Sequence, residues 1–188
     1  MRGEVGFEFL LDLKQPDDGT LLVTPGYNPY VGPDILRRGD DRGRFYPQNV
    51  RLASREDGAF APLFLITNRG RYGRDGRFYP AQTHERGRLL YGTERLTSLA
   101  DWYFDVAAGL LEVRLPWGLL NFTDPSSRSV VRGMDAGGQF LTTKSDGLRV
   151  GVVTYDKGAE PKIRGALPRL DRTGHWRASD FRTWTWEP

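Results

Sequence analysis

Short runs of alternating apolar and polar residues recur along the chain, separated by glycine, proline and aspartate. The first lies at 5–13, where every second residue is apolar, and 20–24 follows a turn sequence at 16–19. Similar runs lie at 62–67, 88–91, 139–143, 148–155 and 182–186. No long segment repeats with a helical period. The pattern predicts an all-β fold, an antiparallel two-sheet sandwich of jelly-roll type with long Gly/Pro/Arg-rich loops and little helix.

One segment predicts its own strand register. If 106–109 is a four-residue loop, the residues of one face pair as Phe104 with Leu111, Trp102 with Val113 and Ala100 with Leu115. The other face pairs Tyr103 with Glu112 and Asp101 with Arg114. A shift of one residue would invert both faces, so their agreement predicts this register and a buried Trp102.

Other segments give weaker predictions. The runs 139–143 and 148–155 predict a second hairpin through 144–147, with Leu148, Val150 and Val152 pointing inward. Residues 117–122 predict a short helical turn after Pro116. Loops are expected at 25–60, 68–85 and 161–174, where glycine, proline and charged residues are frequent.

The chain has 188 residues, which predicts a single domain spanning 1–188. The apolar face of the first strand begins almost at Met1 and needs a cover. Strands from elsewhere are therefore expected to complete the sandwich, supplied by an upstream domain of the same polypeptide, by a cleaved partner chain or by a symmetry mate. The start at Met1 has no signal-peptide pattern, so the protein is either cytoplasmic or has lost a leader.

Charge and composition exclude several function classes. The net charge is only +3, and the basic residues are scattered among acids, so nucleic-acid binding is not expected. No apolar run is long enough for a membrane span. With no cysteine and two histidines, thiolate catalysis and multi-histidine metal sites are excluded. Aspartates in turns leave a structural calcium open as the one cofactor, with candidate ligands Asp17, Asp18, Asp40, Asp41 and Asp135.

No recognisable catalytic motif is present, and the chain is not expected to be an enzyme by itself. Asp101 and Glu112 lie near each other on one face of the predicted hairpin, as the two carboxylates of a glycosidase do. Arg114 lies opposite Asp101, which favours an ordinary ion pair instead. Aromatic rings beside polar groups are instead candidates for stacking on a sugar. The sequence Gly-Arg-Phe-Tyr-Pro occurs twice, at 43–47 and 76–80, with Gln48 and Gln82 close behind. The candidate ligand-binding residues are Tyr103, Glu112 and Arg114 on the hairpin, and Tyr46, Tyr79 and Gln82 in these two repeated stretches. Alternatively, the tryptophans are core residues and the tyrosines only cover sheet edges.

Three stretches carry a family resemblance: 5–9 with Glu8-Phe9, 108–120 with Glu112-Val113-Arg114-Leu115-Pro116-Trp117, and 143–150. They resemble the family-9 carbohydrate-binding modules and the wider DOMON-like sandwich group. The resemblance implies a β-sandwich that serves as an accessory module of a larger bacterial carbohydrate-active protein, outside the cell or in the cell envelope. Members usually have two or three strands before the Glu-Phe strand, which this chain lacks, so the resemblance implies that the chain is the C-terminal part of a longer protein. None of the family's binding residues is transferred.

Two functions follow as hypotheses. The first is a non-catalytic carbohydrate-binding-like accessory module. The second is a structural or interaction domain that packs on a neighbouring catalytic domain or partner chain without binding sugar. An exposed aromatic strip in a groove would favour the first, and a flat apolar outer patch would favour the second.

Overall fold

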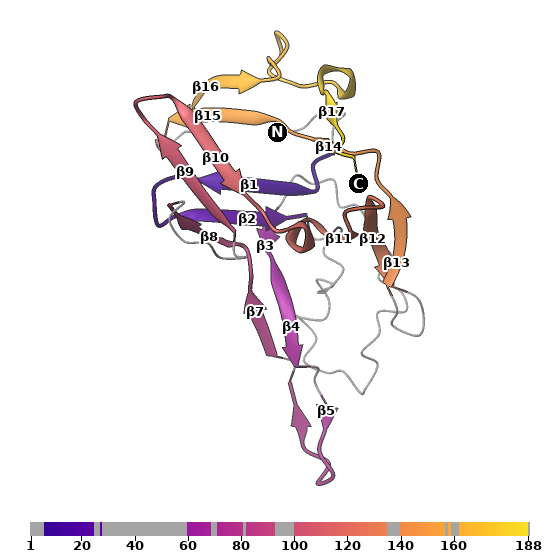
Figure 1. The fold of residues 1–188 in the computed structure, drawn as a ribbon. Helices are drawn as coiled ribbons and strands as arrows, with labels where there is room; N and C mark the ends of the chain where they lie inside the picture. Colours follow the sequence, from indigo (N-terminus) through magenta and orange to yellow (C-terminus); the bar gives the residue numbers. More distant parts are fainter. Residues whose placement is uncertain are drawn as a thin grey trace.

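A computed structural model describes residues 6–24, 27, 60–68, 71–80, 82–92, 100–134, 140–156, 158 and 162–187. These residues are mostly in strands, with almost no helix, and the sheets are curled (Figure 1). The β-rich class predicted from the sequence is therefore confirmed. The described residues do not show two sheets packed face to face, so the sandwich stays a prediction.

The largest sheet has six strands. Its order is β1 (Phe9–Leu13), β2 (Gly19–Val23), β8 (Arg88–Tyr91), β9 (Asp101–Asp105) and β10 (Leu110–Arg114), and β3 (Ala61–Pro62) also pairs with β2. β1 and β2 form the predicted hairpin, with Phe9 opposite Val23 and Leu13 opposite Gly19. β8 and β9 are parallel, and the other pairs are antiparallel.

The β9–β10 hairpin has the predicted register. Phe104 lies opposite Leu111, Trp102 opposite Val113, Tyr103 opposite Glu112 and Asp101 opposite Arg114. The loop is closed by Asp105, whose carboxylate Oδ1 accepts hydrogen bonds from the backbone N–H groups of Ala107 and Ala108 at 2.9 and 3.0 Å. Gly109 completes the loop at a φ of 62°, where a side chain is unfavourable. Local turn chemistry and cross-strand pairing thus specify the same hairpin.

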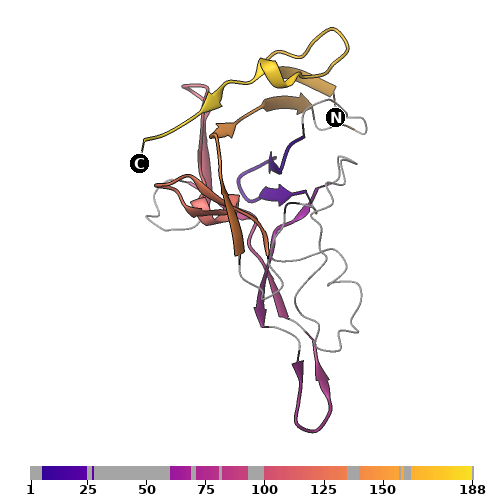
Figure 2. The same ribbon diagram turned by 90° about the vertical axis from the view of Figure 1, so that its right-hand side faces the viewer.

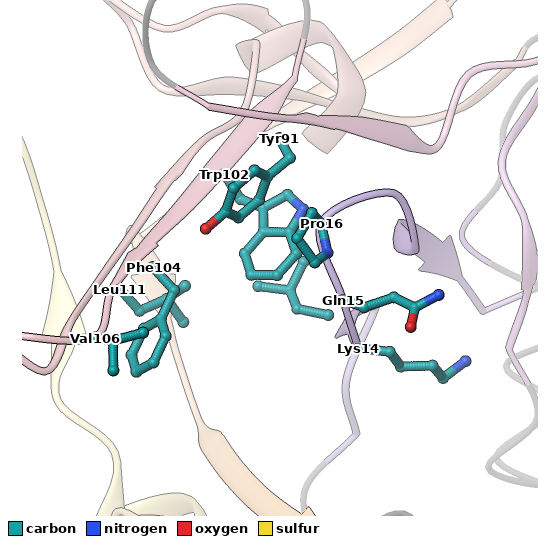
Figure 3. Close-up of a pocket in the computed structure, with 9 residues that line it drawn as sticks. Lys14, Gln15, Pro16, Tyr91, Trp102, Phe104, Val106 and Leu111 are labelled. Atoms are coloured by element: carbon teal, nitrogen blue, oxygen red, sulfur yellow. The ribbon is translucent and has the colours of Figure 1, made fainter.

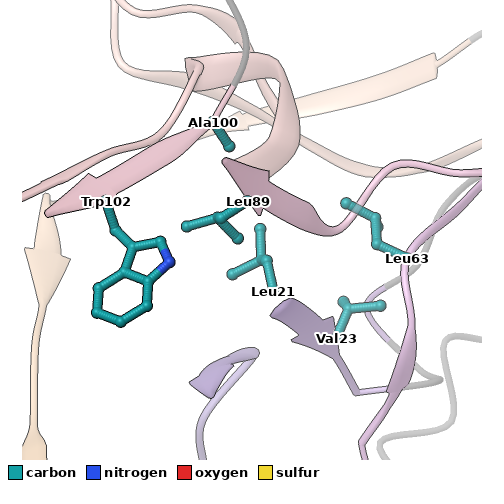
Figure 4. Packing of buried hydrophobic residues seen from close by; sticks show 6 residues of the cluster. All are labelled: Leu21, Val23, Leu63, Leu89, Ala100 and Trp102. Carbon is teal, nitrogen blue, oxygen red and sulfur yellow. The ribbon is translucent and has the colours of Figure 1, made fainter. Parts of the chain in front are cut away.

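The buried core is a cluster of side chains from β2, β8 and β9 and from the residues next to β3 and β9 (Figure 4). Its buried members are Leu21, Val23, Leu63, Leu89, Ala100 and Trp102. Trp102 is only 7% exposed. Its indole packs directly on Gly19, where a Cβ would lie 2.5 Å from Nε1. The bare backbone of Gly19 therefore makes room for the largest side chain of the core.

Part of the face predicted to need a partner is covered by the chain itself. Phe9, Leu11 and Leu13 are partly buried against the core cluster. The Phe7 ring packs against Trp176 and Phe181, with ring centroids 5.6 and 5.7 Å apart. Contacts between the first and last described segments therefore replace some of the cover that the sequence assigned to other chains.

The C-terminal half forms three further sheets. They are β11 (Phe122–Asp124) with β12 (Ser129–Met134) and β13 (Phe140–Lys144), β14 (Leu148–Arg149) with β17 (Thr183–Trp184), and β15 (Val152–Asp156) with β16 (Lys162–Leu167). Single 3₁₀ turns lie at η2 (Trp117–Leu120), as predicted, and η3 (Ala178–Asp180).

The second predicted hairpin is wrong. β13 pairs with β12, and the chain then runs on to pair β14 with the distant β17. Ser145 donates its backbone N–H to the Arg128 carbonyl at 2.9 Å, and Gly147 lies against the Trp184 carbonyl, so 144–147 does not turn back on β13. Val150 and Val152 are 57% and 41% exposed rather than inward. The predicted loop at 161–174 also contains β16.

The predicted loop at 68–85 is instead largely a two-stranded ribbon. β4 (Phe64–Asn68) pairs with β7 (Gln82–Glu85), and β5 (Arg71–Tyr72) pairs with β6 (Phe78–Tyr79). Gly76 at a φ of 77° and the Gly73 N–H, which donates to the Arg77 carbonyl at 2.8 Å, form its end. The ribbon extends away from the rest of the molecule in both views (Figures 1 and 2).

Replacing Trp102 by alanine is expected to lower the free energy of unfolding by about 3–5 kcal/mol, because it empties a large aromatic site in the core. Trp184 is 53% exposed, and the Arg182 guanidinium stacks on its ring. Trp184→Ala is therefore a matched control that should cost about 1 kcal/mol or less. Urea denaturation of both variants measures the difference, and equal losses would show that Trp102 does not anchor the core.

Candidate functional site

A cleft of about 430 Å³ lies between the β1–β2 turn and the β9–β10 hairpin (Figure 3). Its lining residues come from both elements and from the end of β8: Leu13, Lys14, Gln15, Pro16, Tyr91, Trp102, Phe104, Val106 and Leu111. Most of these side chains are apolar or aromatic. Clefts of this size accept a small ligand or one large side chain of a partner.

Aromatic rings form one wall of the cleft. The parallel pairing of β8 with β9 places Tyr91 beside Trp102. Their ring centroids are 5.0 Å apart in an edge-to-face arrangement. Tyr91 also contacts Tyr103, at a centroid distance of 5.7 Å. Tyr91 and Phe104 remain 39% and 42% exposed, although both sit on regular strands. The wall therefore presents rigid ring surface to whatever enters the cleft.

Polar groups are few and stand at the rim. The ammonium of Lys14 pairs with the Asp12 carboxylate at 2.8 Å, and this hydrogen bond and charge raise the pKa of Lys14. Tyr155 donates its hydroxyl to the same carboxylate at 3.0 Å, which raises the pKa of Tyr155. Because Asp12 balances the Lys14 charge, the rim does not select an anionic ligand by charge alone.

The hairpin residues predicted as a sugar face lie on the opposite side of the sheet from the cleft. Tyr103 and Glu112 are cross-strand neighbours, half-buried and exposed respectively. Arg114 makes an ion pair with Asp101, donating its Nε–H to Oδ1 at 3.1 Å and an Nη2–H to Oδ2. Asp101 is buried at 5% exposure, so this pair fastens the open end of the hairpin.

The other predicted residues lie elsewhere. Tyr79 and Gln82 belong to the ribbon, far along the chain from the hairpin, and the Arg77 guanidinium stacks over the Tyr79 ring at 5.7 Å. Tyr46 lies outside the described residues. The structure therefore brings together Tyr103, Glu112 and Arg114 and places Tyr79 and Gln82 on the separate ribbon.

The proposed calcium ligands are not gathered within the described part of the chain. Asp17 and Asp18 lie in the β1–β2 turn, whereas Asp40, Asp41 and Asp135 fall outside the described residues. Among the residues with described positions, no cluster of three or more histidine, aspartate or glutamate side chains could hold a metal ion. In the same residues, no helix has the length and hydrophobicity to cross a membrane.

The sequence analysis missed the cleft residues Tyr91, Phe104 and Gln15. The predicted register placed Phe104 beside Trp102 and Leu111 on one apolar face, and that placement is right. The apolar pattern of this face does not translate into uniform burial, because Trp102 and Ala100 are buried whereas Phe104, Leu111 and Val113 are 37–44% exposed. Alternation reveals which side chains share a face, but what covers that face depends on distant parts of the chain.

No protein-family model, curated protein or solved structure matches this chain. The resemblance to family-9 carbohydrate-binding modules and DOMON-like domains therefore stays a prediction from three short motifs.

Asp101→Asn is expected to lower the free energy of unfolding by about 1–3 kcal/mol, because it removes a charged acceptor that is buried beside Arg114. The Asp156–Arg164 pair supplies the control, since its side chains are 50% and 65% exposed. Asp156→Asn should cost less than about 1 kcal/mol. Thermal or urea unfolding of the two variants gives the comparison, and a neutral Asp101→Asn would exclude this pair as a fastening of the hairpin.

Proposed function

We propose that this chain is a non-catalytic interaction domain that buries the apolar surface of its β9–β10 hairpin against another polypeptide. One observation carries the proposal: β10 is exposed at all five positions although three of them are apolar. Leu110, Leu111 and Val113 are 51%, 44% and 37% exposed. Leu111 and Val113 share one face of the hairpin with Phe104, which is 42% exposed, whereas Leu110 lies on the opposite face. Val106 in the adjoining loop is 81% exposed.

Two physical costs accompany this arrangement in water. Contiguous apolar side chains remain hydrated, and surface patches of this kind commonly mark interaction sites. In addition, β10 is the last strand of its sheet and pairs only with β9 among the described strands, so one row of backbone groups faces outward. Exposed edge strands of apolar sequence readily pair with other strands. A polypeptide partner relieves both costs at once, whereas a small molecule covers only the cleft.

The predicted two-sheet sandwich belongs to this proposal. The curled six-stranded sheet would supply one of its two layers. An upstream domain of the same polypeptide or a separate chain fits the role of partner equally well in chemical terms.

Carbohydrate binding is the second candidate, and the cleft is the observation that favours it. Half-exposed Tyr91 and Phe104 on regular strands present ring faces of the kind that stack on the apolar faces of sugars. Gln15 and Lys14 at the rim supply hydrogen-bonding groups. The predominance of leucine, valine and proline among the other lining residues supports a polypeptide partner more strongly, because sugar hydroxyls need polar partners when buried.

Leu111→Lys is expected to reduce both self-association and binding of a hydrophobic dye such as anilinonaphthalene sulfonate, because it places a charge in the apolar hairpin surface. Leu141→Lys is the matched control, as Leu141 is 46% exposed on a different sheet, in β13. Light scattering over a concentration series and dye fluorescence check the result. A wild-type chain that stays monomeric and binds no dye would contradict the interaction function.

If the cleft binds sugar, the wild-type protein is retained on immobilised polysaccharide, and Phe104→Ala weakens retention about tenfold, equivalent to ~1.4 kcal/mol. Glu112→Ala, which changes an exposed residue on the opposite face of the hairpin, should leave retention unchanged. Affinity electrophoresis through a panel of soluble polysaccharides measures both. The reverse pattern would move the site to the face of Tyr103, Glu112 and Arg114, and absence of retention for the wild-type chain would remove this candidate.

A further inference from the structure

The outer strand β10 has a self-complementary sequence. Around Val113, the chain reads Leu111-Glu112-Val113-Arg114-Leu115, with an acid on one side, a base on the other and leucines at both ends. An antiparallel partner reads the same five residues in reverse. Resting on the interaction function proposed above, we infer that the partner of β10 is the β10 strand of a second copy of this chain, paired across a two-fold axis at Val113.

This register matches both faces of the strand. Val113 meets Val113 of the second copy, and Leu111 meets Leu115, so the apolar face continues without a polar interruption. On the other face, Glu112 of each copy meets Arg114 of the other. Two ion pairs and three apolar pairs therefore form between five residues on each side, and opposite charges on facing strands stabilise a pair.

Neighbouring registers lack this match. A two-fold axis at Glu112 places the two Glu112 carboxylates opposite each other, and an axis at Arg114 does the same with two guanidinium groups. Like charges directly opposite are destabilising. An axis between Glu112 and Val113 sets a charged residue against an apolar one at each central position. The charge pattern therefore selects the register with its two-fold axis at Val113.

The structure keeps the required side chains on the correct faces. Glu112 is exposed, and Val113 and Leu111 share the face of Trp102. The Arg114 guanidinium is already aligned with the strand by its bonds to Asp101, and its side chain is 47% exposed. Because a guanidinium carries five N–H donors in one plane, it can bridge Asp101 of its own chain and Glu112 of the second copy.

The ends of the strand limit the pairing to this length. Pro116 follows Leu115 and has no N–H, so it lies at the end of the intermolecular ladder, where proline is tolerated. At the other end, β10 begins at Leu110, directly after the loop at 106–109 that joins it to β9. The result is a short, isologous contact that joins two six-stranded sheets into one, as a two-fold axis requires.

Cysteine cross-linking tests the register, because the chain has no cysteine of its own. Val113→Cys places two thiols at directly opposite positions, where Cβ atoms are about 4.5–5.5 Å apart, and it should oxidise to a disulfide-linked dimer. Leu111→Cys is the matched control. Its two thiols would lie four residues apart along the strands, about 13 Å, and should not cross-link. A mixture of Leu111→Cys and Leu115→Cys should cross-link to each other.

A charge variant gives an independent readout. Glu112→Lys sets lysine against Arg114 in both ion pairs and should shift the dimer to monomer in sedimentation analysis. Glu85→Lys makes the same charge change at an exposed position on the β4–β7 ribbon and should leave the dimer intact.

The outcomes separate the two proposals. Efficient cross-linking of Glu112→Cys in place of Val113→Cys, or equal cross-linking at every position, would overturn the register inferred above. If Val113→Cys does not cross-link and the wild-type chain is monomeric while Leu111→Lys still abolishes dye binding, the dimer is overturned and β10 is an interaction surface for a different partner. If the wild-type chain is monomeric and binds no dye, the interaction function fails together with the dimer.

Discussion

The packing of Trp102 on Gly19 holds the β9–β10 hairpin against the β1–β2 hairpin in the six-stranded sheet. Without a side chain at Gly19, the indole reaches the backbone of β2 and is shielded there with Leu21 and Leu89. Trp102 also lies in β9, so its burial fixes the position of the whole β9–β10 hairpin relative to the first hairpin. The Asp101–Arg114 pair, the Tyr91 ring and the cleft between the hairpins all take their places from this contact.

The β9–β10 hairpin combines consistent local hydrogen bonding and pairing with an outer strand whose apolar side chains are exposed. Its loop is capped by Asp105, its register agrees on both faces, and its inner tryptophan is buried. Its outer strand, by contrast, exposes Leu111 and Val113 to water. Native sequences rarely combine such local consistency with a mismatch in burial unless the exposed surface has a use. This contrast is the physical basis for treating the hairpin as the functional part of the chain.

The sequence allowed the elements with local pairing to be predicted, and failed where pairing is distant. The β9–β10 hairpin could be read because the two strands are four residues apart and each face tests the other. The strand at 148–149 was paired wrongly because its partner, 183–184, lies over thirty residues away and carries no complementary pattern. The sequence at 68–85 predicts a loop where the structure has most of the ribbon, because arginine and glycine interrupt its alternation. The cleft escaped prediction for a related reason, since Phe104 has a core pattern without a core environment.

The contact of Phe7 with Trp176 and Phe181 links segments about 170 residues apart in the sequence. During synthesis from the N-terminus, Phe7 and the strand that follows it emerge long before these rings exist. Closure of a loop of this size is slow, because distant segments must meet before their contacts reward them. The Phe7 ring beside the first hairpin therefore stays uncovered until Trp176 and Phe181 have been made. We expect this segment to be the part of the chain that most needs chaperone protection.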